Sequence, residues 1–138
     1  KQKLVPAYAK QMITSTEFID SLLRRPVKEV QKDWGFERWF INDKENDLCY
    51  KELHIDSGKG FSNHFHDKKQ EYFCVKSGRL WVRITDTANR EKSSRHLDAG
   101  DILYLPRLVP HEVKAPLGDV VITEISTLWT TLFLMTPR

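Results

Sequence analysis

The chain has 138 residues, of which 40% are hydrophobic and 30% charged, a length and composition suited to one domain with a hydrophobic core. Its 22 Lys and Arg residues and 19 Asp and Glu residues give a net charge of +3, too even a balance for the electrostatic binding of nucleic acid or anionic lipid. No segment approaches the ~20 apolar residues of a membrane span, and the first ten residues lack the apolar run of a signal peptide. We therefore expect a small-molecule partner, with no nucleic acid and no membrane.

Two cysteines, Cys49 and Cys74, are too few for the disulfide frameworks that stabilise small secreted domains. Both lie in apolar, strand-like runs, where a free cysteine behaves as a small hydrophobic residue. The sequence predicts two buried free thiols and a cytoplasmic protein.

A short helix is predicted near the start of the chain. Thr14 and Glu17 have the spacing of a capping box, in which each side chain satisfies a free backbone N–H. Four apolar residues then recur at helical spacing, namely Phe18, Ile19, Leu22 and Leu23. Pro26 ends the run. We expect this helix to pack on the outside of a sheet, within an N-terminal segment of residues 1–33.

From residue 34 onward, short runs rich in β-branched and aromatic residues alternate with turn-forming clusters. This near-regular spacing is typical of an all-β sandwich or barrel. We place strands at residues 36–41, 48–55, 61–65, 70–75, 80–85, 102–105, 112–114 and 120–126, with another within 130–134. The sequence thus predicts an all-β domain over residues 34–138, with the double-sheet jelly-roll arrangement that can enclose a ligand.

Three histidines and one glutamate have the spacing of a metal site. His64 and His66 are two residues apart, so in a strand both imidazoles face the same side. Glu71 leads the next strand, and we expect it to complete three ligands from a single hairpin, while His111 reaches the site from across the barrel. Such a ligand set suits one divalent ion, Fe, Mn, Zn, Ni or Cu, with positions left for substrate or water.

The glycines around these ligands extend the pattern. Residues 58–78 read GKGFSNHFHDKKQEYFCVKSG, and residues 100–111 read GDILYLPRLVPH. Together they resemble the two-part signature of the cupin superfamily. The resemblance implies a double-stranded β-helix barrel, a metal held by His64, His66, Glu71 and His111, and a homodimer.

A narrower resemblance is to the mannose-6-phosphate isomerase type of cupin. It rests on residues 34–39 (WGFERW), 50–55 (YKELHI), 77–80 (SGRL) and 122–125 (ITEI). It implies an isomerase or epimerase of sugars or sugar phosphates, in which the metal acts as a Lewis acid while a base moves a proton. The same ligand set also suits a dioxygenase or lyase acting on a small organic acid, or a non-catalytic sugar-binding protein.

Further residues are candidates for contact with the substrate. Lys51 shares strand parity with the apolar residues of its run, which favours a role in catalysis or in binding an anionic substrate. Arg107, in the turn before His111, is a candidate phosphate clamp. Tyr104 and Glu124 are candidates for proton transfer. Tyr72 alternates with Glu71 and is therefore expected to face outward.

Overall fold

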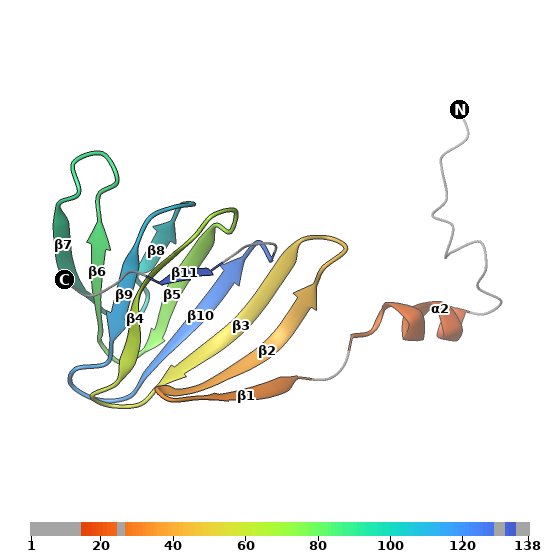
Figure 1. The fold of residues 1–138 in the computed structure, drawn as a ribbon. Helices are drawn as coiled ribbons and strands as arrows, with labels where there is room; N and C mark the ends of the chain where they lie inside the picture. The colour runs from red at the N-terminus through yellow and green to blue at the C-terminus, as the bar shows by residue number, and fades with distance from the viewer. Residues whose placement is uncertain (1–14, 25–26, 129–131, 135–138) are drawn as a thin grey trace.

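The computed structural model describes residues 15–24, 27–128 and 132–134, which form two antiparallel sheets and one helix (Figure 1). The larger sheet has the strand order β1 (Lys28–Lys32), β2 (Gly35–Asp43), β3 (Leu48–Ile55), β10 (Val120–Ser126), β5 (Glu71–Ser77) and β8 (Ile102–Leu105). The smaller sheet has the order β11 (Leu132–Leu134), β4 (Gly60–His66), β9 (His111–Lys114), β6 (Leu80–Thr85) and β7 (Lys92–Leu97). The predicted all-β jelly-roll is confirmed.

The hydrophobic core lies between the two sheets, because alternate residues of each strand point inward. In the larger sheet, Leu53, Ile122 and Val75 are paired across β3, β10 and β5, and all three are buried. Val82 and Val113 are buried residues of the smaller sheet and are paired across β6 and β9. Towards one end of these strands the inward positions change from apolar to charged, and there the candidate site lies.

Two strands were not predicted, β1 and β7, and each lies at an edge of its sheet. Their sequences, KEVQK and KSSRHL, are polar and largely exposed, so the alternation of apolar and polar residues that marks an inner strand is weak. Charged residues on edge strands also discourage pairing with other chains. Because β1 pairs with β2 along its whole length, the sheet begins at Lys28, before the expected domain boundary at residue 34.

The helix is observed as α2 (Ser15–Leu22), and it buries none of its residues. The side chains of Ile19, Leu22 and Leu23 are 58%, 47% and 50% exposed, so the expectation that this face packs on a sheet is wrong. Figure 1 shows the helix away from both sheets. Thr14 and Pro26 lie outside the described residues. Within the described part of the chain, no helix is both long enough and apolar enough to span a membrane.

The two cysteines are free, as predicted. Cys49 is buried, whereas Cys74 is only partly buried. Burial raises the pKa of the Cys49 thiol, which keeps it protonated and unreactive.

Candidate metal centre

Two neighbouring strands of the smaller sheet bring three histidines together. His64 and His66 project from β4, and His111 lies directly opposite His64 on β9. One nitrogen from each of the three rings lies within 4.8 Å of the others. His111 therefore reaches the site from the adjacent strand, and the expectation that it comes from across the barrel is wrong.

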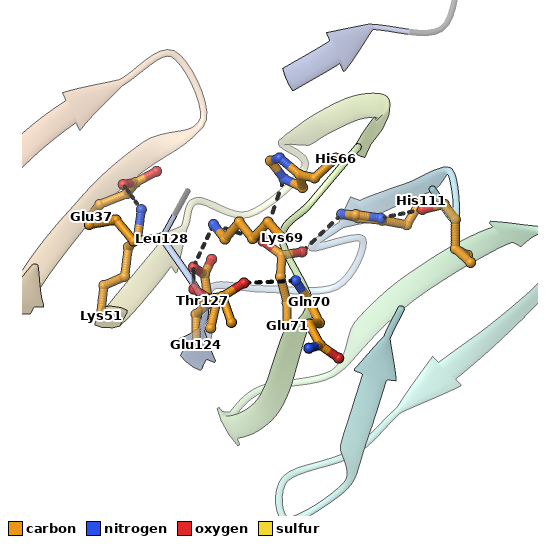
Figure 2. Close-up of polar contacts among 12 residues, drawn as sticks. Glu37, Lys51, His66, Lys69, Gln70, Glu71, His111, Glu124, Thr127 and Leu128 are labelled. Carbon is orange, nitrogen blue, oxygen red and sulfur yellow. Dashed lines mark hydrogen bonds and ion pairs between the residues drawn. The ribbon is translucent and has the colours of Figure 1, made fainter. Parts of the chain in front are cut away.

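Glu71 is the group that comes from across the barrel, because β5 belongs to the larger sheet. Its Oε1 lies 3.5 Å from His66 Nε2, and its Oε2 lies 3.4 Å from His111 Nε2. Figure 2 shows the carboxylate between these two imidazoles. The expectation that β4 and β5 form a paired hairpin is therefore wrong. The two strands lie in different sheets, and the connection between them carries the chain from one sheet to the other. This crossing is what lets the two sheets contribute ligands to one point.

Backbone carbonyls fix the tautomers of two histidines. The Nδ1 of His64 lies 2.9 Å from the carbonyl of Ser62, and the Nδ1 of His111 lies 3.0 Å from that of Val109. A carbonyl only accepts, so each Nδ1 carries the proton and donates it. Each Nε2 keeps a lone pair, which is the arrangement found in metal-binding histidines.

The polar atoms of this group fit a divalent cation. Glu71 Oε2, His111 Nε2 and His66 Nδ1 are buried and have no hydrogen-bond partner among the described residues, a costly arrangement unless something else satisfies them. Burial lowers the pKa of all three histidines, that of His66 to about 3, so the rings are neutral at neutral pH. Three neutral imidazoles beside a carboxylate are the donors that first-row divalent metals prefer.

A buried lysine that the sequence does not single out, Lys69, forms ion pairs with two carboxylates of the site. Lys69 Nζ lies 2.9 Å from Glu71 Oε1 and 3.0 Å from Glu124 Oε2, and Figure 2 shows it between the two carboxylates. Burial alone would lower the pKa of Lys69, but the charges of Glu124 and Glu71 raise it. Lys69 is therefore a permanent cation. Nothing in its sequence position, in the connection between β4 and β5, distinguishes it from Lys68.

The pKa values of the two carboxylates beside Lys69 are shifted in opposite directions, up for Glu71 and down for Glu124. Burial and the charge of Glu124 raise the pKa of Glu71, although a bound divalent ion would favour its ionised form. Burial also acts to raise the pKa of Glu124, but Lys69, Lys51 and Ser126 outweigh burial and lower it. Glu124 is thus a buried, ionised carboxylate.

A cavity of about 240 Å³ adjoins these groups. Two predicted substrate-contacting residues, Lys51 and Glu124, line it. Lys51 Nζ lies 3.3 Å from Glu37 Oε1 and 5.0 Å from the centre of the Trp39 ring. The lining residues are Lys32, Trp34, Glu37, Lys51, Leu53, Phe61, Ser62, His64, His66, Lys69, Glu71, Phe73, Glu124 and Leu134.

The other two predicted residues, Tyr104 and Arg107, do not line this cavity. Tyr104 is exposed, pairs with Tyr72 across β8 and β5, and donates its hydroxyl to Gln70. It therefore lies on the outer face of the sheet, and the strand parity that correctly places Tyr72 outward applies equally to Tyr104. Arg107 is exposed, and its Nε donates to the carbonyl of Lys68. The structure gives neither residue a place beside a substrate in this cavity.

Comparison with solved structures gives the same fold in larger proteins. The capsular polysaccharide assembling protein CapF from Staphylococcus aureus has a TM-score of 0.71 and 17% sequence identity, covering 86% of this chain and 34% of that one. Oxalate decarboxylase from Bacillus subtilis has a TM-score of 0.68 and 17% identity, covering 79% of this chain and 30% of that one. A formate complex of oxalate decarboxylase from Lactobacillus farciminis has a TM-score of 0.65 and 15% identity, covering 79% of this chain and 33% of that one. This chain thus matches about a third of each of these proteins.

The comparison with curated proteins gives no match. The model of the cupin family matches residues 54–127, a span that includes all four candidate ligands and more than half of the chain. The fold, the His64, His66 and His111 cluster and this match agree: the chain belongs to the cupin family.

Proposed function

We propose that this cupin is a metal-dependent enzyme that holds one divalent ion, Fe, Mn, Zn, Ni or Cu, through His64, His66, Glu71 and His111. A small, oxygen-rich substrate would bind beside the ion in the cavity. The observation that carries the proposal is the convergence of three histidine nitrogens within 4.8 Å on a carboxylate whose Oε2 is buried and has no hydrogen-bond partner in the described part of the chain.

The bound ion would supply Lewis acidity to a substrate oxygen. The side chains of the cavity supply the rest of the chemistry. Lys51 Nζ contacts Glu37 and has further N–H donors for an anionic or hydroxylated substrate. Glu124, held ionised by Lys69 and Lys51, is the candidate proton acceptor of the cavity wall. The apolar rings of Trp34, Phe61 and Phe73 limit the access of water.

The first candidate reaction is the isomerisation or epimerisation of a sugar or sugar phosphate. It is supported by the resemblance of residues 34–39, 50–55 and 122–125 to the mannose-6-phosphate isomerase type of cupin, and by the presence of Lys51 and Glu124 in one cavity. Their charges provide one group to bind an anionic substrate and one to accept a proton.

A second candidate is a dioxygenase or lyase that acts on a small organic acid. The cavity volume of about 240 Å³ corresponds to roughly eight water molecules at ~30 Å³ each, a size suited to a small carboxylic acid. Three lysines line it together with three carboxylates, Lys32, Lys51 and Lys69 with Glu37, Glu71 and Glu124, so a bound divalent ion would leave the cavity with a net positive charge that favours a negative substrate. The likeness of the fold to oxalate decarboxylases supports the same class. A non-catalytic sugar-binding protein is the third possibility for the same site.

The test compares metal-free protein with protein reloaded with each of the five metals. Incubation with sugar phosphates in heavy water would reveal isomerisation or epimerisation as deuterium incorporation at carbon. Incubation with small carboxylic acids would reveal oxygenase or lyase activity as oxygen uptake or carbon dioxide release. We expect one metal-dependent activity that His64→Ala abolishes and that His96→Ala, which changes an exposed histidine on β7, retains. Metal-dependent binding of a sugar without turnover would instead favour the binding protein.

We further propose that the chain works in the cytoplasm as a homodimer. The assembly is supported by the family, since cupins commonly pair through their strands, and the compartment by the two free thiols. Light scattering on the purified protein tests the assembly: a mass near twice 16.2 kDa is expected, and a mass of one chain at all concentrations would contradict it.

A further inference from the structure

We infer that Lys69 is a positioning residue that restricts Glu71 to a single metal-binding oxygen. The inference rests on the proposed metal centre, and it assigns to Lys69 a role that the ligand pattern does not contain.

The two oxygens of Glu71 have different partners. Each oxygen lies near one ligand histidine, Oε1 at 3.5 Å from His66 Nε2 and Oε2 at 3.4 Å from His111 Nε2. Only Oε1 also contacts Lys69, whose Nζ lies 2.9 Å away, whereas Oε2 is buried and has no hydrogen-bond donor among the described residues. An ion bound by both oxygens would share Oε1 with the ammonium, and two cations on one oxygen repel each other. Oε2 is therefore the oxygen left for the ion.

Lys69 is held in place and cannot readily leave Oε1. Its second contact is Glu124 Oε2 at 3.0 Å, and Ser126 Oγ donates to the same oxygen. The side chains of Lys69, Glu71 and Glu124 are only 10%, 3% and 5% exposed, so water cannot easily replace either contact.

The backbone next to Lys69 is fixed as well. The Gln70 N–H donates to the hydroxyl of Thr127, and the Thr127 N–H donates to the carbonyl of Gln70 (Figure 2). These two bonds join the β4–β5 connection to the end of β10. The lysine is thus anchored by its side chain and by the adjacent peptide.

This restriction has a consequence for the substrate. A carboxylate that gives one oxygen instead of two leaves an additional coordination position on the ion, and catalytic sites differ from structural sites in keeping such positions open. Lys69 would therefore keep the ion accessible without touching the substrate's reacting atoms.

The test uses Co²⁺ as the probe metal, because its visible absorption reports the coordination number. Lys69→Met keeps the length of the side chain and removes its charge. With the competing cation gone, Glu71 is free to bind through both oxygens. We expect Lys69→Met to bind Co²⁺ at least as tightly as the wild type, with weaker visible absorption per bound ion, and Lys69→Arg to restore the wild-type spectrum. Lys51→Met, which removes a charge from the same cavity but leaves Glu71 untouched, should also give the wild-type spectrum.

Three outcomes would overturn the inference. One is a wild-type spectrum from Lys69→Met with Co²⁺ bound, and another is the same spectral change from Lys51→Met. The third is weaker binding of Co²⁺ by both Lys69→Met and Lys69→Gln. Because Lys69→Gln keeps a hydrogen-bond donor, a loss of affinity in both variants would mean that the lysine only maintains the fold of the site. If the wild type itself binds no Co²⁺, the proposed metal centre fails as well, and the two failures are thus distinguishable.

Discussion

Glu71 is the residue on which the candidate centre depends, because it is the only one of the four predicted ligands that the larger sheet supplies. It was predictable from the sequence, since it follows the paired histidines at a spacing that places it at the start of the next strand. Lys69 was not predictable, because its role arises only when β10 brings Glu124 alongside β5. Tyr104 was a candidate for proton transfer, but it lies on the outer face of the sheet, an orientation that alternation along β8 indicates.

The first prediction concerns the loss of the Glu71 carboxylate. Glu71→Gln keeps the shape but removes the negative charge, so we expect the affinity for a divalent ion to fall roughly 100-fold or more, at or beyond the upper end of the effects of mutating residues that support a ligand. Titration against a chelator measures the change. Glu112→Gln, on the same strand as His111 but paired with Arg83, is the control. Equal affinities in the wild type and Glu71→Gln would contradict the assignment of Glu71 as a ligand.

A second prediction at this scale concerns Glu52, on the outer face of the larger sheet. The carboxylate of Glu52 accepts a hydrogen bond from Lys76 and another from the ring N–H of His54, and these bonds lower its pKa despite its burial. A carboxyl whose pKa is lower in the folded state stabilises the fold above its unfolded pKa, and this contribution is lost as the pH falls through the folded pKa. Glu52→Gln should therefore be about 1 kcal/mol less stable than the wild type at pH 7, and the difference should shrink at an acidic pH below the lowered pKa of Glu52.

Urea unfolding of both metal-free proteins at the two pH values measures this difference. A gap between wild type and Glu52→Gln that stays constant with pH would show that the side chain acts through its shape and not its charge.

At the scale of elements, the inner strands were predicted well because apolar residues alternate along them. The sheet to which each strand belongs was not predictable, since β4 and β5 are neighbours in sequence yet lie in different sheets, while β4 pairs with the distant β9. Such pairings depend on contacts between residues far apart in the chain. The polar edge strands β1 and β7 escaped prediction because they bury little.

The β4–β9 pairing also provides a prediction. A side chain at Gly60 would overlap the carbonyl oxygen of Val113 on β9, so Gly60→Ala must push apart the two strands that carry His64 and His111. We expect a loss of about 2 kcal/mol in the free energy of unfolding and a weaker affinity for metal. Ser94→Ala, on the exposed strand β7, should stay within about 0.5 kcal/mol of the wild type. Full stability and metal affinity in Gly60→Ala would contradict the close approach of the strands.

At the scale of the whole molecule, the stability resides in the two sheets and not in the helix. Ile122 is fully buried between the sheets, whereas Ile19 on α2 is 58% exposed. Ile122→Ala should therefore lower the free energy of unfolding by about 3 kcal/mol, and Ile19→Ala by no more than about 0.5 kcal/mol. Chemical denaturation measures both. A large loss from Ile19→Ala would mean that the apolar face of α2 is covered in solution.

From the family, the fold and the proposed metal centre, we expect each chain to bind one divalent ion between the two sheets. Elemental analysis of protein purified from metal-supplemented medium tests it most directly. The account predicts close to one divalent ion per chain in the wild type and in His96→Ala, and close to none in folded His64→Ala. Equal metal content in all three proteins, or none in the wild type, would contradict it.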